Sequence, residues 1–150
     1  MPDSNFNEES FFFQSVNNVC RKPALTCGPD ISVIEAASLM KENNTAGLVV
    51  LDDNDGSIGI ISVHDLRDLI AVSGGDLTGH RVKDIMHVGV ITVRHQAYVF
   101  EAIFKMAKNN IHRLAVVDEE QKLIGIVNAT DLLSQQTRSP IYLNQEMEAA

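Results

Sequence analysis

The chain has 150 residues, of which 45% are hydrophobic, and a formal net charge of −8 at pH 7. This composition predicts a folded core, and the negative charge argues against nucleic acid or an anionic membrane as a general partner. No apolar run approaches the ~18 residues of a membrane span, and the N-terminal residues lack the pattern of a signal peptide. Cys20 and Cys27 are the only cysteines, so we expect reduced thiols in a cytoplasmic protein.

The first half of the chain predicts a strand, a helix, two strands and a second helix. Residues 1–15 are predicted to form a polar tail and lead-in, with Phe11 to Phe13 capping the fold. A strand at 24–27 precedes a helix at 32–43, where apolar residues at 33, 36, 37 and 40 have the spacing of one buried face. Strands at 47–52 and 57–62 are joined by a hairpin signal, Asp-Asn-Asp-Gly, and a helix follows at about 63–72.

The second half repeats this order. A glycine-rich linker at 73–81 leads to a strand at 90–93 and to a helix at 98–109 with apolar residues at 99, 102, 103 and 106. Strands at 113–118 and 123–127 and a helix at about 129–136 complete it. Residues 138–150 are predicted to form a terminal helix or tail.

An internal repeat explains why the two halves agree. When residues 25–71 are aligned with 91–137 at an offset of 66, fifteen of the 47 pairs are identical. One β-α-β-β-α unit of about 50 residues buries too little surface to be stable alone. We therefore predict an α/β (α+β) fold of two such repeats, at 16–72 and 82–137, packed sheet to sheet with pseudo-two-fold symmetry.

Each repeat carries one strand–turn–aspartate motif, IGIISVHDL at 58–66 and IGIVNATDL at 124–132. Ser62 lies where a helix begins, so free backbone N–H groups there favour an anion such as phosphate. Asp65 is placed to accept two hydrogen bonds from a ribose diol, and Gly59 would let a ligand approach the strand. A structural alternative stays open, because Ser62 and Asn128 are also good helix N-caps and Ser-x-x-Asp is close to a capping box.

His112 and Arg113 stand at the entry of a predicted buried strand. The planar guanidinium of arginine suits a phosphate, and histidine gains charge as the pH falls. A solvated surface pair is the alternative. No catalytic or metal-binding motif is found, since the loop at 51–62 that resembles an EF-hand has Leu51 and Ser62 where acidic ligands are needed. We predict no catalytic residue, no metal site and no required cofactor.

These motifs, with VKDIM at 82–86 and HRLAVVD at 112–118, resemble a tandem pair of cystathionine-β-synthase (CBS) domains, a Bateman module. The resemblance covers about residues 16–136. Asn128 departs from the serine or threonine that the family often has at its position. Residues 139–150 also resemble the flank of the CBS pair in bacterial nucleotidyltransferases. The resemblance implies ribose contacts from Asp65 and Asp131, phosphate contacts from Ser62, Asn128, His112 and Arg113, and an adenine cradle near Thr26 and Thr92, with Gly59 and Gly125 in the adjoining strands.

The function implied is a non-enzymatic signal-transduction module that binds AMP, ADP, ATP or a related adenosyl ligand in clefts between the repeats. It would act on an attached or partner effector domain. We expect a homodimer formed by the helices after each motif, through exposed Leu66, Leu69, Ile70, Leu132 and Leu133. Two alternatives stay open, a ligand-free dimerisation scaffold and the regulatory fragment of a nucleotidyltransferase.

Overall fold

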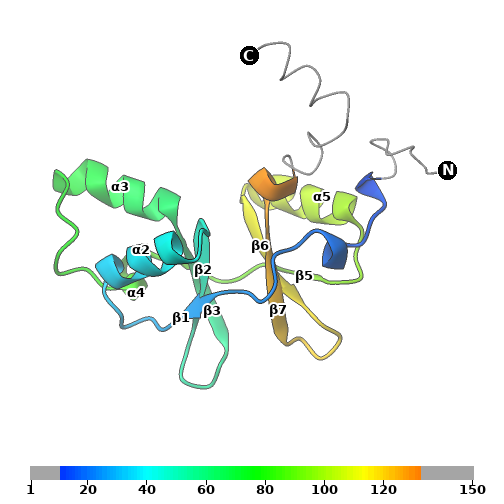
Figure 1. Ribbon diagram of the computed structural model, residues 1–150, viewed down its shortest axis with the longest axis horizontal. Helices are drawn as coiled ribbons and strands as arrows, with labels where there is room; N and C mark the ends of the chain where they lie inside the picture. The colour runs from blue at the N-terminus through cyan, green and yellow to red at the C-terminus, as the bar shows by residue number, and fades with distance from the viewer. Residues whose placement is uncertain (1–10, 133–150) are drawn as a thin grey trace, which may run out of the picture. The chain divides into compact units, whose positions relative to one another are not determined.

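The structure is a computed structural model that describes residues 11–132. These residues form two compact units (Figure 1). The central unit is Ala24–Ile91, and the terminal unit joins residues 11–23 to residues 92–132. The predicted tail at 138–150, the flank at 139–150 and the end of the last predicted helix lie outside the described residues. Every helix within 11–132 is too short or too polar to span a bilayer.

The central unit contains a four-stranded sheet in the order β1-β2-β3-β4. Its elements are β1 (Thr26–Cys27), α2 (Val33–Glu42), β2 (Gly47–Leu51), β3 (Ser57–Ser62), α3 (Val63–Ser73), α4 (Val82–Ile85) and β4 (His87–Val88). Strands β1 and β2 are parallel, and β2, β3 and β4 pair antiparallel. Figure 1 shows α2, α3 and α4 gathered on one side of these strands.

Local signals explain where the central helices begin and end. The Ser32 hydroxyl accepts a hydrogen bond from the backbone N–H of Glu35 at 3.0 Å and so caps α2. Asn43 caps the other end of α2, and Gly74, with a φ of 71°, ends α3 in the left-handed conformation. The apolar sides of α2, β2, β3 and α3 meet in one buried core, which comprises Val33, Ala36, Met40, Leu48, Val50, Ile61, Leu66, Leu69 and Val82.

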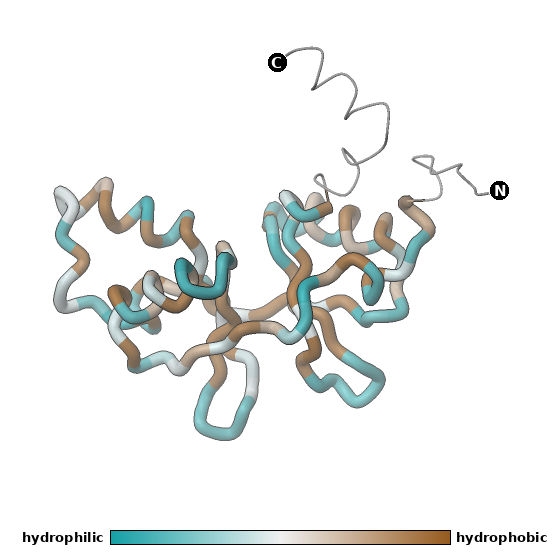
Figure 2. Tube along the Cα trace, viewed as in Figure 1, coloured by the Kyte–Doolittle hydropathy of each residue, from teal (hydrophilic) through white to brown (hydrophobic). Residues whose placement is uncertain are grey.

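The terminal unit contains a three-stranded sheet in the order β5-β6-β7. Its elements are the 3₁₀ turn η1 (Val16–Asn18), β5 (Thr92–Arg94), α5 (Val99–Asn109), β6 (Arg113–Val117) and β7 (Leu123–Asn128), and residues 129–132 begin a further helix. The predicted mixed α/β class is confirmed, with the same order of elements in both repeats. Figure 2 shows hydrophobic colour along the strands and hydrophilic colour at both hairpin tips.

One predicted core position is wrong. Val99, Ala102 and Met106 on α5 are buried as expected, but the Ile103 side chain is 36% exposed. The apolar residues of α5 form two stripes, and Ile103 belongs to the second one with Phe100 and Phe104. The spacing of apolar residues alone does not tell which stripe faces the sheet.

The lead-in segment of each repeat joins the sheet of the other repeat. Residues 80–88 form the β4 edge of the central unit, where Ile60 pairs with His87. Residues 11–23 occupy the equivalent place in the terminal unit, where Arg21 and Ile126 exchange two backbone hydrogen bonds of 2.9 and 3.0 Å. The compact units therefore divide the chain differently from the repeat in the sequence.

Candidate functional site

Three polar residues are buried in the described part of the chain, and all three belong to the repeated motif. Ser62 and Asp65 lie at the start of α3 and Asn128 ends β7, with exposed fractions of 4%, 7% and 3%. Burial of a polar side chain costs free energy unless hydrogen bonds replace its contacts with water. The hydrogen bonds of these residues therefore decide what the motif can do.

Asp65 in the central unit is held from two sides. Its Oδ2 accepts hydrogen bonds from the backbone N–H of Ser62 at 2.8 Å and from the Ser62 hydroxyl at 3.3 Å. Its Oδ1 lies 3.0 Å from Nε2 of His87 on β4. The bond from the Ser62 backbone is half of a capping box, so the capping alternative is present in the structure. Capping occupies only Oδ2, and the second oxygen of this buried carboxylate contacts an exposed histidine.

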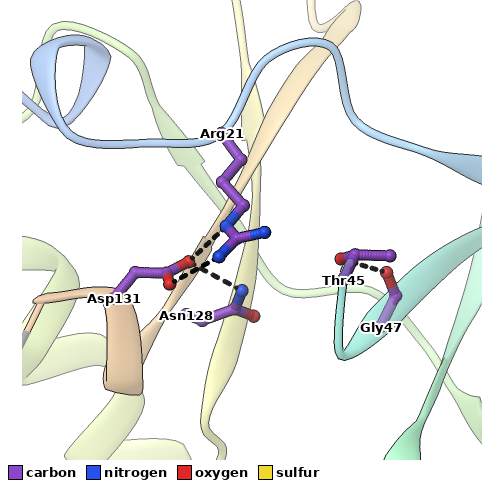
Figure 3. Close-up of polar contacts among 5 residues, drawn as sticks. All are labelled: Arg21, Thr45, Gly47, Asn128 and Asp131. Atoms are coloured by element: carbon purple, nitrogen blue, oxygen red, sulfur yellow. Dashed lines mark hydrogen bonds and ion pairs between the residues drawn. The ribbon is translucent and has the colours of Figure 1, made fainter. Parts of the chain in front are cut away.

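Asp131 in the terminal unit is held more firmly. Arg21 donates from Nε to Oδ2 at 3.0 Å and from Nη2 to Oδ1 at 3.2 Å, which makes a two-point ion pair (Figure 3). Asn128 donates from Nδ2 to Oδ2 at 2.9 Å. Asn128 thus supports the aspartate as Ser62 does, but with its side-chain amide.

The contacts of Arg21 and His87 with the motif aspartates were not predicted from the sequence. The two residues are 66 positions apart, the offset of the repeat, and each lies beside the motif aspartate of its unit. Both residues lie just before the aligned ranges, 25–71 and 91–137. The same offset of 66 places these two basic side chains at equivalent positions.

The two motif glycines have a structural role. A Cβ on Gly59 would lie 2.6 Å from the carbonyl oxygen of His87, and one on Gly125 would lie 2.6 Å from that of Arg21. Only glycine allows the lead-in backbone to approach this closely. The space beside each glycine is therefore filled by the chain itself, which gives these residues a reason other than ligand access.

The predicted adenine segments lie on the first strands of the two sheets. Thr26 on β1 is exposed and pairs with Val49. Thr92 on β5 is half-buried, and its carbonyl accepts a hydrogen bond from Lys105 Nζ at 2.6 Å. Each threonine therefore belongs to the same unit as one motif aspartate.

His112 and Arg113 belong to the terminal unit with Asp131. Arg113 begins β6 and is the register partner of Asn128 on β7. His112 is exposed and contributes to a hollow of about 290 Å³ whose walls are mainly apolar. In the central unit the equivalent register partner of Ser62 is Gly47, whose carbonyl accepts a bond from Thr45 Oγ1 at 3.2 Å (Figure 3). Of the two units, only the terminal one therefore has an arginine at this register position.

Shifted pKa values occur away from the motif. Burial raises the pKa of the Cys27 thiol to about 11. The contact with His95, 2.9 Å from Oε1, lowers the pKa of the exposed Glu119 carboxyl. Within residues 11–132, no three His, Cys, Asp or Glu side chains are placed to hold a metal ion.

The architecture and the motif can be compared with known proteins. The family model of the CBS domain matches residues 16–72 and again residues 82–138. The chain belongs to the CBS domain family. A solved CBS domain pair, that of protein MJ0100 in complex with 5′-methylthioadenosine and S-adenosyl-L-methionine, is 28% identical with a TM-score of 0.71, and the match covers 83% of this chain and 96% of that chain. CBSX2 in complex with AMP is 27% identical with a TM-score of 0.67, covering 83% and 97%.

Curated relatives of this CBS pair are longer proteins. The uncharacterized protein MJ1232 of Methanocaldococcus jannaschii is 36% identical over 118 residues, which are 79% of this chain and 38% of that protein. Inosine-5′-monophosphate dehydrogenase of the same organism is 33% identical over 120 residues, which are 80% of this chain and 23% of the enzyme. The match to these relatives therefore spans well under half of their length.

Proposed function

We propose that this CBS pair is a regulatory module that binds an adenine nucleotide or a related adenosyl compound. The observation that carries the proposal is the carboxylate beside a helix start, which occurs once in each unit as the buried Asp65 and the half-buried Asp131. Two solved CBS relatives hold adenosyl ligands, S-adenosyl-L-methionine with 5′-methylthioadenosine in one and AMP in the other. The chemistry of the motif and the ligands of the relatives thus agree.

In the central unit, a ribose diol would bind at Oδ1 of Asp65. The Ser62 bonds to Oδ2 would keep the carboxylate in place while the ligand replaces His87. The His87 side chain is 79% exposed, whereas the Asp65 side chain is only 6% exposed, so the ligand would displace an exposed imidazole from a buried oxygen. A ribose hydroxyl would take the place of the imidazole at this oxygen, and each hydrogen bond from a hydroxyl to the charged oxygen is of the strong class.

A phosphate would lie at the start of α3. This helix has 11 residues and begins at Val63, so its first backbone N–H groups and its dipole favour an anion. The Ser62 hydroxyl makes only a long bond of 3.3 Å to Asp65 and can rotate toward a phosphate oxygen. Asp65 and Ser62 would then bind two parts of one nucleotide.

We infer that the module acts on another domain and is not itself an enzyme. One relative is a dehydrogenase of which the match covers 23%, so the chain resembles a part of that enzyme. Ligand binding would change the equilibrium between two packing states, and the effector would respond to that change. The effector would be attached to this chain or bound to it.

We further infer a homodimer, through a different surface from the one predicted. Leu66, Leu69 and Leu132 are buried within their own units, with exposed fractions of 8%, 8% and 3%, so the predicted exposure of these leucines is wrong. Of the predicted set, Ile70 is exposed and Leu133 lies outside the described residues.

Helix α5 offers the larger apolar face. Phe100, Ile103 and Phe104 are 42%, 36% and 67% exposed and lie on one stripe. Phe13 and Tyr98 extend it, with ring centroids 5.6 Å apart. Contiguous exposed aromatic side chains are typical of a protein interface, and a two-fold axis would pair this face with itself.

The dimer can be tested with one surface variant. Phe104→Glu adds a charge to the most exposed position of the stripe and should convert a dimer to monomers in sedimentation velocity. Lys41→Glu, on an exposed residue at the end of α2, serves as a charge control. A monomeric wild type at tens of micromolar would contradict the dimer. A dimer that binds no adenosine compound would favour the scaffold alternative.

Thermal unfolding with ligands tests the binding proposal. A ligand at ~100 times its Kd adds about 2.7 kcal/mol to the stability of the protein it binds. We expect an increase in Tm with AMP, ADP, ATP, S-adenosyl-L-methionine or 5′-methylthioadenosine, and a smaller one with GMP. No increase with any adenosine compound at millimolar concentration would contradict the proposal.

A further inference from the structure

The two motif aspartates contact different basic side chains, each from the lead-in segment of its unit. Arg21 donates from Nε to Oδ2 of Asp131 at 3.0 Å and from Nη2 to Oδ1 at 3.2 Å, so one planar group contacts both oxygens (Figure 3). His87 contacts only Oδ1 of Asp65, at 3.0 Å from Nε2. The arginine therefore occupies both carboxylate oxygens of its unit, whereas the histidine occupies one.

We propose that the lead-in residue determines whether a motif aspartate is available to a ligand. Arg21 blocks Asp131, and His87 leaves Asp65 available when its imidazole is neutral. Each chain therefore binds one adenosyl ligand, in the central unit, and binds it less tightly as the pH falls. The inference rests on the proposed function and adds to it the choice of unit and a proton as regulator.

The acceptor positions of each carboxylate support this choice. A carboxylate has about four lone-pair positions, and the two hydroxyls of a ribose diol need two of them. Asp131 uses three, for the two bonds from Arg21 and for one from Asn128 Nδ2 at 2.9 Å. On Asp65, both bonds from Ser62 end on Oδ2. Oδ1 of Asp65 is therefore available to both hydroxyls once His87 moves away.

The two lead-in side chains also differ in what a ligand must displace. The His87 side chain is 79% exposed and the Arg21 side chain 46% exposed. The two donors of Arg21 belong to one rigid guanidinium, so a ligand must break both charge-assisted hydrogen bonds together. At Asp65 a ligand replaces a single contact.

Charge distinguishes the two contacts further. A guanidinium stays charged at physiological pH, whereas histidine changes its charge between about pH 5 and 8. A charged imidazole attracts the Asp65 carboxylate more strongly than a neutral one, so a fall in pH strengthens the contact that a ribose must replace. Binding at Asp65 should therefore weaken as the pH falls, while the Arg21 contact stays the same.

The other charged groups on the elements next to β4 have contacts elsewhere. Strand β3, which pairs with β4, has no charged residue. Those on α3 and α4, apart from Asp65, are His64, Arg67, Asp68, Lys83 and Asp84. Arg67 pairs with Asp68, Lys83 pairs with Asp30, and Asp84 accepts the backbone N–H of Arg81. Within residues 11–132, the acidic side chain that contacts His87 is Asp65, and His64 is the titratable neighbour that needs a control.

A reciprocal exchange of the two lead-in residues tests the proposal. Backbone pairing holds both positions, Arg21 with Ile126 and His87 with Ile60, so the side chains can be exchanged between equivalent places. Calorimetry with AMP at pH 8 should give one site per chain for wild type. His87→Arg should lower the affinity by about tenfold or more, since one further charge-assisted bond must be broken. Arg21→His should add a second site per chain.

Titrations at pH 6 give a second readout. From pH 8 to pH 6, the affinity of wild type relative to that of His87→Gln should fall by about three- to fivefold, because the charged histidine holds the carboxylate in most molecules. The ratio removes the titration of the AMP phosphate, which is common to both chains. His64→Gln is the control and should keep the pH dependence of wild type.

The outcomes separate the two proposals. If wild type binds no AMP, the proposed function fails and this inference fails with it. Two sites in wild type, one site in Arg21→His, or the same pH dependence in His87→Gln as in wild type would overturn only this inference.

A measurement on the unaltered chain covers the case of a misfolded variant. When AMP is added to wild type, the ring signals of His87 should shift in NMR spectra, and the Nε–H signal of Arg21 should stay in place. A shifted Arg21 signal, or unchanged His87 signals, would overturn the proposal.

Discussion

Asp65 gives the sharpest test of how capping and binding share one carboxylate. Asp65→Ala removes the acceptor of the buried Ser62 N–H at 2.8 Å. An unsatisfied buried donor costs about 1–3 kcal/mol, so the free energy of unfolding should fall by that amount. Asp65→Asn keeps an oxygen for this bond and alters mainly the contact with His87, so its expected cost is smaller than that of Asp65→Ala.

The two Asp65 variants should differ in stability, but both should bind AMP more weakly than wild type. Both variants lose the charge that strengthens hydrogen bonds from ribose, each worth about 1.5–3 kcal/mol, which corresponds to about ten- to a hundredfold in affinity. Urea denaturation gives the stabilities, and calorimetry with AMP gives the affinities. If Asp65→Asn binds AMP as tightly as wild type, the carboxylate is only a helix cap. If Asp65→Ala is as stable as wild type, the capping argument is wrong.

Two further predictions concern the lead-in contacts and β1. Gly125→Ala should destabilise the protein by about 1–3 kcal/mol or more, because its Cβ would lie 2.6 Å from the Arg21 carbonyl oxygen. Gly28→Ala is the control: its Cβ would have no neighbour within 4 Å, so urea denaturation should show little change in stability. The Cys27 thiol, whose pKa is raised by burial to about 11 from 9.0, should react with iodoacetamide more slowly in the folded than in the urea-unfolded protein at pH 8, as measured by mass spectrometry. A folded thiol that reacts as fast as the unfolded one would contradict the raised pKa. Because the unfolded chain loses this proton at lower pH than the folded one, the contribution of Cys27 to the free energy of unfolding should decline as the pH rises from about 9 to 11.

The sequence predicted most elements because their local signals are strong. The apolar spacing at 33, 36 and 40, the cap at Ser32 and the paired asparagines at the helix ends each have a local cause. The ion pairs of Arg21 and His87 were not predictable in the same way. They join residues 110 and 22 positions apart through the pairing of lead-in segments, which no local pattern encodes.

The sequence also did not predict which apolar and acidic side chains near the motif are buried. Leu66 and Leu69 follow the motif aspartate and could face either a partner or the core. The structure places both leucines in the core. The apolar stripe of α5 that contains Phe104 lies at the surface instead. For Asp65, burial makes its loss more costly than the loss of an exposed first-turn acid.

The most direct test of adenosyl-ligand binding is calorimetry of AMP with wild type and with the double variant Asp65→Asn, Asp131→Asn. Both asparagines keep an oxygen acceptor, so the fold should be retained, and circular dichroism would verify it. We predict saturable heat with wild type and an affinity at least about tenfold lower for the double variant. Equal affinities, or no heat with wild type at millimolar AMP, would contradict the role of the repeated aspartate motif in binding.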